Sequence, residues 1–309
     1  MPGEPVIIGV SACLLGEKVR YDGGDRRDTV VTGLLAVHFR LVPVCPEVEC
    51  GMTVPREPMR LEGGQDAPRL VTHKSRLDLT DQLLTFTRRR VAELAAVELC
   101  GFVGKKGSPS CGVWRVPIHQ PGVATRSGSG LFVAGLQREL PLLPVVEEGA
   151  LQDPAGCDHF VERVLALGRW REFCRTDGSA AGLVSFHARH KYQLMAHHPV
   201  LARSLGKLVA EGARLASGVL LGRYGTAFMS CLAYEATVRK HVNALQHIAG
   251  YFKRVLTAEE KAELQGLIDD FRRGLVPRLA PMALLRQYVC RFDQPYLLEQ
   301  TYLASRPGE

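Results

Sequence analysis

The sequence predicts an α/β N-terminal domain with a parallel, Rossmann-like sheet, followed by an all-α C-terminal domain. Strand-like apolar runs alternate with helical patterns in the first half, which favours a parallel sheet with crossover helices. From about residue 181 onward the hydrophobic pattern is almost entirely helical. Thr176-Asp177-Gly178-Ser179 is typical of a short linker, so we expect domains at 1–176 and 177–309.

The expected elements follow from the periodicity of apolar residues. In the N-terminal domain we expect strands at 5–11, 39–44, 98–104, 113–117 and 142–146. Its clearest helix spans about 79–97, and Asp78 or Thr80 is placed to cap it. Two more helices are expected at about 129–139 and 156–174, the second leading into the next domain. For the C-terminal domain the pattern predicts helices at 183–197, 199–216, 224–249, 257–275 and 280–304.

Composition limits the class of protein. The chain has 309 residues, of which 46% are hydrophobic and 23% charged, as in soluble globular proteins. It contains no apolar stretch long enough to cross a bilayer, and its first residues lack the basic and apolar regions of a secretory signal. Nine cysteines without a regular spacing then indicate reduced thiols. We therefore expect a cytoplasmic protein without membrane association.

The net charge of +7 is concentrated in the second half, because residues 1–150 carry +1 and residues 151–309 carry +6. Ten basic residues lie between 185 and 254, where only Glu211 and Glu235 oppose them. Such a surplus predicts a polyanionic partner, most commonly nucleic acid, although a solvated helical surface is the alternative. The candidate RNA contacts are Arg189, Lys191, Arg203, Lys207, Arg239 and Lys240. Nearby histidines raise a metal site as an alternative to RNA contact or helix packing: His187, His190, His197 and His198.

Three cysteines each follow a strand-like run. Cys13 comes after 6–10, Cys45 comes after 39–44, and Cys111 closes a glycine-, serine- and proline-rich loop. Ligands of open parallel sheets bind at the carboxyl ends of the strands, so these thiols are candidates for one metal site. Thiolates hold iron–sulfur clusters, and three of them leave one iron of a 4Fe-4S cluster open. Zinc and three separate buried cysteines remain the alternatives, although no C-x-x-C pair supports zinc.

Four blocks of sequence carry a family resemblance. Residues 8–24 (IGVSACLLGEKVRYDGG), 43–56 (PVCPEVECGMTVPR) and 105–112 (KKGSPSCG) together resemble the thiouracil desulfidase family. Residues 186–199 (FHARHKYQLMAHHP) are similar to the partner domain of its two-domain branch, the tRNA 4-thiouridine desulfidases. The resemblance covers nearly the whole chain and implies tRNA as the partner.

The resemblance also implies a site. It implies a 4Fe-4S cluster held by Cys13, Cys45 and Cys111, with Glu47 and Ser108 as catalytic residues. The chain departs from single-domain relatives by having Glu49-Cys50-Gly51 where a glycine-rich sequence is usual. Cys50 is therefore an alternative cluster ligand or an acceptor of product sulfide.

The implied reaction replaces a thiocarbonyl sulfur by oxygen, releases sulfide and transfers no electrons. Residues of the same loops are candidates for positioning the substrate: Ser11, Arg20, Tyr21, Asp22, Arg56 and Lys105. Two other functions remain open. One is a desulfidase of free thiouracil or thiouridine whose helical half serves dimerisation. The other is a non-enzymatic RNA-binding protein that carries an iron–sulfur cluster or zinc.

Overall fold

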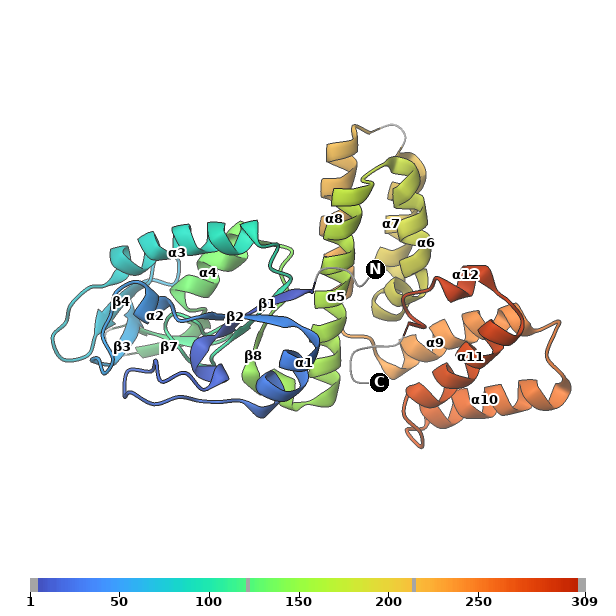
Figure 1. Ribbon diagram of the computed structural model, residues 1–309, viewed down its shortest axis with the longest axis horizontal. Coiled ribbons are helices and arrows are strands. Elements are labelled where there is room, and N and C mark those ends of the chain that lie inside the picture. Colours follow the sequence, from blue (N-terminus) through green and yellow to red (C-terminus); the bar gives the residue numbers. More distant parts are fainter. Residues whose placement is uncertain (1–4, 121–122, 213–214, 305–309) are drawn as a thin grey trace. The chain divides into compact units, whose positions relative to one another are not determined.

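A computed structural model describes residues 5–120, 123–212 and 215–304, and it divides the chain into two compact units, Met1–Arg171 and Glu172–Glu309. The first unit contains all the strands among the described residues, and the second is helical (Figure 1). Helix α5 (Pro154–Thr176) contributes residues to both units. The predicted fold class, an α/β half followed by an all-α half, is confirmed.

The first unit is built on a parallel sheet of four strands in the order β2-β1-β5-β8. The strands are β1 (Ile7–Ser11), β2 (Arg40–Val44), β5 (Gly101–Gly104) and β8 (Val145–Glu147). In the register of this sheet, Val10 of β1 lies between Pro43 of β2 and Val103 of β5. The chain leaves β1 for β2 on one side and later returns to β5 on the other. Such a switch in strand order is where open parallel sheets bind ligands.

Helices cover both faces of this sheet. On one face, α3 (Thr80–Ala96) and α4 (Leu131–Glu139) lie side by side (Figure 1). The ring of Phe132 in α4 lies 5.8 Å from that of Phe102 in β5 and 6.4 Å from that of Phe86 in α3. The other face packs against α5, where a Cβ on Gly101 would overlap Val164. The short segment η2 (Val31–Leu35) adds Val31 and Leu35 to that side of the core, and the exposed α1 (Ala36–His38) follows it.

A second, mixed sheet was not predicted. Its order is β4-β3-β6-β7, with β3 (Met59–Glu62), β4 (Arg69–Thr72), β6 (Val116–Gln120) and β7 (Val123–Gly128). The expected strand at 113–117 is therefore shifted, and it belongs to this sheet rather than to the parallel one. Strands β3 and β4 escaped prediction because each is four residues long, carries charged residues and is stabilised by pairing with a distant segment.

The second unit contains α6 (Ala180–His197), α7 (Pro199–Glu211), α8 (Ser217–Leu232), α9 (Val238–Ala249), α10 (Ala258–Arg272), α11 (Leu279–Arg291) and α12 (Pro295–Leu298). The single helix expected at 224–249 is wrong, because Thr237 caps α9 by accepting a hydrogen bond from the Lys240 amide. The helix expected at 280–304 is also divided. Asp293 has a positive φ of 41°, and Pro295 then begins α12.

The histidines of the second unit take part in helix packing. The His190 ring stacks on Phe186 with centroids 4.1 Å apart, and His187 Nδ1 lies 3.0 Å from the Tyr224 hydroxyl. Within the described residues, no group of three or more His, Cys, Asp or Glu side chains is placed to hold a metal ion. Among the helices described, none combines the length and apolar character that crossing a membrane requires.

Candidate active site

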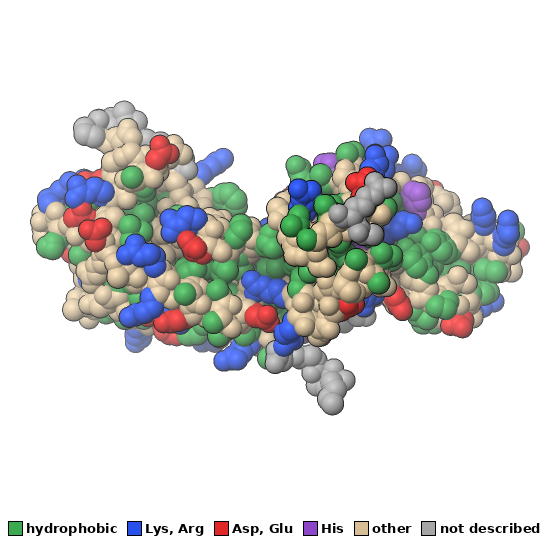
Figure 2. Space-filling model, turned by 90° about the horizontal axis from the view of Figure 1, so that it is seen from above, with side chains coloured by type: hydrophobic (Ala, Val, Ile, Leu, Met, Phe, Trp, Pro, Cys, Tyr) green, Lys and Arg blue, Asp and Glu red, His purple; other side chains and the backbone are tan. Residues whose placement is uncertain are grey.

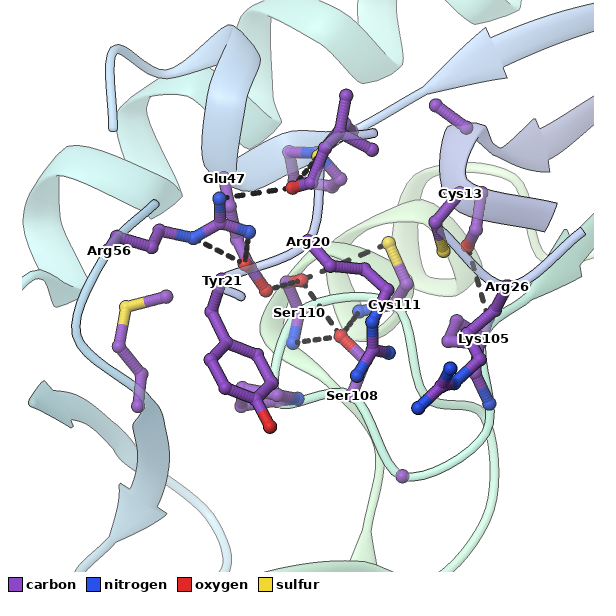
Figure 3. Close-up of a pocket in the computed structure, with 18 of the residues that line it drawn as sticks. Cys13, Arg20, Tyr21, Arg26, Glu47, Arg56, Lys105, Ser108, Ser110 and Cys111 are labelled. Atoms are coloured by element: carbon purple, nitrogen blue, oxygen red, sulfur yellow. Dashed lines mark hydrogen bonds and ion pairs between the residues drawn. The ribbon is translucent and has the colours of Figure 1, made fainter. Parts of the chain in front are cut away.

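The three cysteines that follow strands line one cavity of about 440 Å³. Cys13 lies in η1 (Ala12–Leu15), directly after β1, and Cys45 precedes α2 (Pro46–Glu49), directly after β2. Cys111 lies in the loop that follows β5. Figure 3 shows Cys13 and Cys111 among the side chains that line this cavity. The parallel sheet thus brings together thiols that are up to 98 positions apart in the sequence.

Burial keeps these thiols protonated in the absence of a bound cation. Desolvation, reinforced by repulsion from Cys45, raises the pKa of the Cys13 thiol to about 11. Desolvation also raises the pKa of Cys111 well above its usual value, and the nearby Cys45 and Cys13 add to that effect. Ionised thiols in this cavity would therefore repel one another. A positively charged group in the cavity would favour the thiolates.

Close backbone packing fixes the loop that carries Cys111. A Cβ on Gly104, the last residue of β5, would overlap the carbonyl of Cys111. A Cβ on Gly130, which precedes α4, would overlap the carbonyl of Ser110. Only glycine permits such approaches, so the loop is held between the parallel sheet and α4.

Glu47, in the first turn of α2, is held by two partners. Arg56 Nε donates to Glu47 Oε2 at 3.0 Å, and Arg56 Nη2 contacts the same oxygen. Ser110 Oγ donates to Glu47 Oε1 at 2.7 Å (Figure 3). The Glu47 and Arg56 side chains are only 12% and 8% exposed. Arg56 is itself anchored, because its Nη1 donates to the carbonyl of Val19 at 3.0 Å. These bonds fix a carboxylate beside the cysteines.

Ser108 is linked to Glu47 through Ser110. Ser108 Oγ accepts hydrogen bonds from the amides of Cys111 at 3.1 Å and Ser110 at 3.3 Å. It also lies 3.1 Å from Ser110 Oγ. Two amides occupy the acceptor positions of Ser108, so its hydroxyl hydrogen is directed to Ser110 or into the cavity. Sequence reasoning did not single out Ser110, although its place directly before Cys111 was the available signal.

Some of the predicted substrate-positioning residues line the cavity, and others hold neighbouring residues in place. Arg20 and Tyr21 line the cavity, and Arg20 lies over the Tyr21 ring at 5.4 Å. Asp22 is outside the lining and pairs with Arg20 at 3.3 Å. Ser11 Oγ accepts a hydrogen bond of 3.0 Å from the Lys105 amide, which ties β1 to the loop after β5.

Lys105, which was also predicted to position the substrate, lines the cavity, and its side chain pairs with Glu148 at the start of η3 (Glu148–Gln152). Arg26, Met59 and His73 line the cavity as well, and none of these three had been predicted. Met59 begins β3 and His73 follows β4, so both depend on the second sheet that the sequence did not reveal.

Cys50 is turned away from the cavity. Its Sγ donates to the carbonyl of Glu47 at 3.2 Å, and Cys50 is absent from the cavity lining. Its position at the carboxyl end of α2 directs the thiol back onto the helix that carries Glu47. The structure therefore does not group Cys50 with the other three cysteines.

The candidate RNA contacts lie on three helices of the second unit. Arg189 and Lys191 are exposed in α6, Arg203 and Lys207 in α7, and Arg239 in α9. Figure 2 shows basic side chains on the surface of this unit. Lys240 differs from the others, because its Nζ donates to the carbonyls of His197 at 2.6 Å and Glu235 at 3.0 Å. It caps backbone carbonyls within the unit.

Known proteins resemble the two parts of the chain separately. Residues 8–148 match the family model of 2-thiouracil desulfurase, and residues 191–307 match a family of unknown function, DUF1722. The uncharacterized protein YbgA of Escherichia coli (strain K12) is 28% identical over 151 residues, which is 48% of this chain and 89% of that protein. The uncharacterized protein YbbK of Bacillus subtilis (strain 168) is 29% identical over 112 residues, covering 34% of this chain and 73% of that protein.

One solved structure is also similar. It is that of the 4Fe-4S-dependent thiouracil desulfidase TudS, which is 33% identical, with 48% of this chain and 94% of that chain covered and a TM-score of 0.40. The sequence identity over nearly all of TudS agrees with the family match at 8–148. The chain therefore belongs, through its N-terminal half, to the 2-thiouracil desulfurase family.

Proposed function

We propose that this protein is a desulfidase that replaces the thiocarbonyl sulfur of 4-thiouridine in tRNA by oxygen, with a 4Fe-4S cluster as cofactor. The observation that carries the proposal is the meeting of three thiols with the linked Glu47, Ser110 and Ser108 side chains in one cavity. The family of the N-terminal half and the described activity of TudS support it.

The three thiols are of the chemical type that holds such a cluster. Cys13, Cys45 and Cys111 would hold it, because thiolates are the usual cluster ligands and glycine-rich loops let a bulky group approach the backbone. A cluster with three protein ligands supplies an open iron, a soft Lewis acid suited to a thiocarbonyl sulfur. The stoichiometry balances without electron transfer: the thiocarbonyl compound and water give the carbonyl compound and hydrogen sulfide.

The chain's own residues would handle the base and the proton. Tyr21 is 42% exposed at the cavity and offers a ring face on which a pyrimidine can stack. The Glu47 carboxylate, fixed by Arg56, is placed to accept a proton from an attacking water. Ser110 carries a hydrogen-bonded connection from Glu47 to Ser108, whose hydroxyl can orient the water or the base.

The choice of tRNA as substrate rests on the second unit. Its charge surplus and its exposed arginines and lysines suit a polyanion, with an affinity that falls as the salt concentration rises. The target base would leave its stack to enter the cavity. A cavity of about 440 Å³ has the volume typical of small-molecule sites, which keeps free thiouracil or thiouridine as the second candidate substrate.

The test compares the two substrates on the same protein. The full chain is purified without oxygen, its iron and sulfide are measured, and it is incubated with bulk tRNA or with free 4-thiouracil. Nucleoside analysis should show loss of 4-thiouridine from tRNA, with a matching gain of uridine and sulfide. If the protein consumes free 4-thiouracil and leaves 4-thiouridine in tRNA unchanged, its function is that of a small-molecule desulfidase.

A control variant separates catalysis from binding. Glu47→Gln keeps the size of the side chain and removes its ability to accept a proton, so turnover should fall while iron and sulfide stay at the wild-type content. If neither protein consumes a thiopyrimidine although both are fully loaded, the desulfidase proposal fails and the non-enzymatic alternative gains support.

A further inference from the structure

The second unit carries a pair of parallel tyrosine rings on its surface. Tyr251 lies in η5 (Gly250–Phe252) and Tyr296 in α12, and their ring centroids are 5.9 Å apart with planes inclined by 16°. The two residues are 42% and 36% exposed. The neighbouring Tyr192, by contrast, is buried beneath them with its ring edge-on to Tyr296 at 6.5 Å. The pair therefore presents aromatic surface to solvent on a packed base.

Three basic residues lie near this pair, one through its contact with Tyr192 and two by their place in the sequence. Lys191 Nζ lies 5.6 Å from the centroid of the Tyr192 ring, which in turn contacts Tyr296. Lys253 and Arg254 lie two and three residues after Tyr251 in the sequence and are exposed. Among the residues with assigned positions, none of these three cations forms an ion pair with a carboxylate. Their charge is available to an anionic partner.

Tyr296, one member of the pair, is held in place before any partner binds. The Tyr296 hydroxyl donates to the carbonyl of Ala188 in α6 at 3.5 Å. Gln300 Nε2 donates to the same carbonyl at 2.8 Å and to the Tyr296 carbonyl at 3.3 Å, which ties α12 to α6. A side chain already fixed in its bound conformation loses little entropy on binding.

We propose that Tyr251 and Tyr296 form a stacking platform for an unpaired base of an RNA strand, whose phosphates are bound by Lys191, Lys253 and Arg254. Exposed ring faces beside unpaired cations match the two recurring parts of single-stranded nucleic acid, a planar base and a phosphate. The inference rests on RNA as the partner in the proposed function, and it adds where an unpaired segment binds and by which contacts.

The test measures binding of fluorescently labelled single-stranded oligouridine and of a blunt RNA duplex to the full chain. The wild type should prefer the single strand, because duplex bases are already stacked. Tyr251→Ala should raise the Kd for the single strand about 5- to 150-fold, the range that loss of one base–aromatic stack gives. Tyr251→Phe should retain the wild-type affinity. Leu275→Ala, at another exposed apolar residue of this unit, should leave the Kd unchanged.

The salt dependence of RNA binding distinguishes the contribution of the tyrosine rings from that of the basic side chains. Lys191→Ala should reduce the slope of log Kd against log salt by about 0.7, the value of one phosphate contact on a single strand. Tyr251→Ala should change the Kd and leave that slope unchanged. Circular dichroism and thermal melting of each variant show whether it is folded, and Tyr251→Leu provides a second variant that keeps apolar bulk.

The outcomes distinguish this inference from the proposed reaction. If folded Tyr251→Ala and Tyr251→Leu bind the single strand like the wild type, or if the wild type prefers the duplex, the platform is excluded. Selective binding of an acidic protein in place of RNA would also overturn it. If binding depends on the Tyr251 ring but 4-thiouridine in tRNA is not consumed, the platform stands and the proposed reaction fails.

Discussion

Ser110 Oγ donates a 2.7 Å hydrogen bond to Glu47 Oε1, and this bond joins the segments that follow two different strands of the parallel sheet. Glu47 comes after β2 and Ser110 after β5, and β1 lies between these strands. The Ser110 hydroxyl therefore links the carboxylate of Glu47 to the hydroxyl of Ser108. The residues implied to be catalytic are therefore connected through a third residue.

Replacing Ser110 tests this connection. In Ser110→Ala the hydroxyl between Ser108 and Glu47 is lost, so we expect kcat to fall by about tenfold to a hundredfold, because positioned proton transfer contributes at least that much in enzymes. Single-turnover desulfurisation by loaded protein measures the effect, and iron content checks that the cluster is retained. Ser110→Thr keeps a hydroxyl and should recover much of the rate. A wild-type rate in Ser110→Ala would show that the connection has no catalytic role.

Substitutions of the cysteines should differ in how much they lower the iron content of the protein. We expect Cys13→Ser, Cys45→Ser and Cys111→Ser each to lower the iron bound per chain after anaerobic reconstitution, because all three residues line the cavity. Cys50→Ser is the matched control, since the Cys50 thiol bonds to the Glu47 carbonyl instead. Iron and acid-labile sulfide assays provide the measurement. Iron loss in Cys50→Ser equal to that in the other three would assign a ligand role to Cys50.

Gly130 should not tolerate a side chain. Gly130→Ala places a Cβ against the Ser110 carbonyl and forces the loop of Cys111 to move, so we expect about 1–3 kcal/mol less unfolding free energy and reduced iron content. Gly266→Ala in α10 meets no atom within 4 Å and should gain up to about 1 kcal/mol from helix propensity. Denaturant unfolding of both variants gives the comparison. Equal stability of Gly130→Ala and wild type would contradict the packing argument.

The buried Cys231 thiol should make the unfolding free energy of the protein fall as the pH rises into the alkaline range. Burial raises the pKa of this thiol to about 12, so the folded state keeps its proton where the unfolded state has lost it. Its contribution is fully present below about pH 8.5, the ordinary thiol pKa, and is lost as the pH rises toward 12. Between these values the unfolding free energy should fall by up to about 1.4 kcal/mol per pH unit.

Cys231→Ala isolates that contribution. The variant removes the thiol, so its unfolding free energy should decline less steeply than that of the wild type between pH 9 and 10. Parallel denaturant titrations across this interval measure both slopes, and their difference cancels the shared titration of other groups. Identical slopes would mean that the Cys231 thiol ionises equally in the folded and unfolded protein.

The sequence by itself determined the parallel sheet and the positions of the three cysteines relative to it. Apolar runs at 5–11 and 39–44 are long enough to define strands, and a thiol that directly follows such a strand has to lie at its carboxyl end. Glu47 lies two residues after Cys45, and it was identified through the family resemblance. The strands and the cysteine positions depend on local periodicity and on the topology that parallel strands impose.

Only the tertiary structure decided how the side chains around the cysteines are connected. The sequence did not reveal Ser110 as the link between Glu47 and Ser108, and it left Cys50 as an alternative ligand, because both points depend on the direction of each side chain after the chain has turned. Arg56 was expected to contact substrate, and the structure uses it to hold Glu47. The second sheet and the tyrosine pair were also hidden, since both are formed by segments far apart in the sequence. Pairing between distant segments is set by packing, and no local pattern records it.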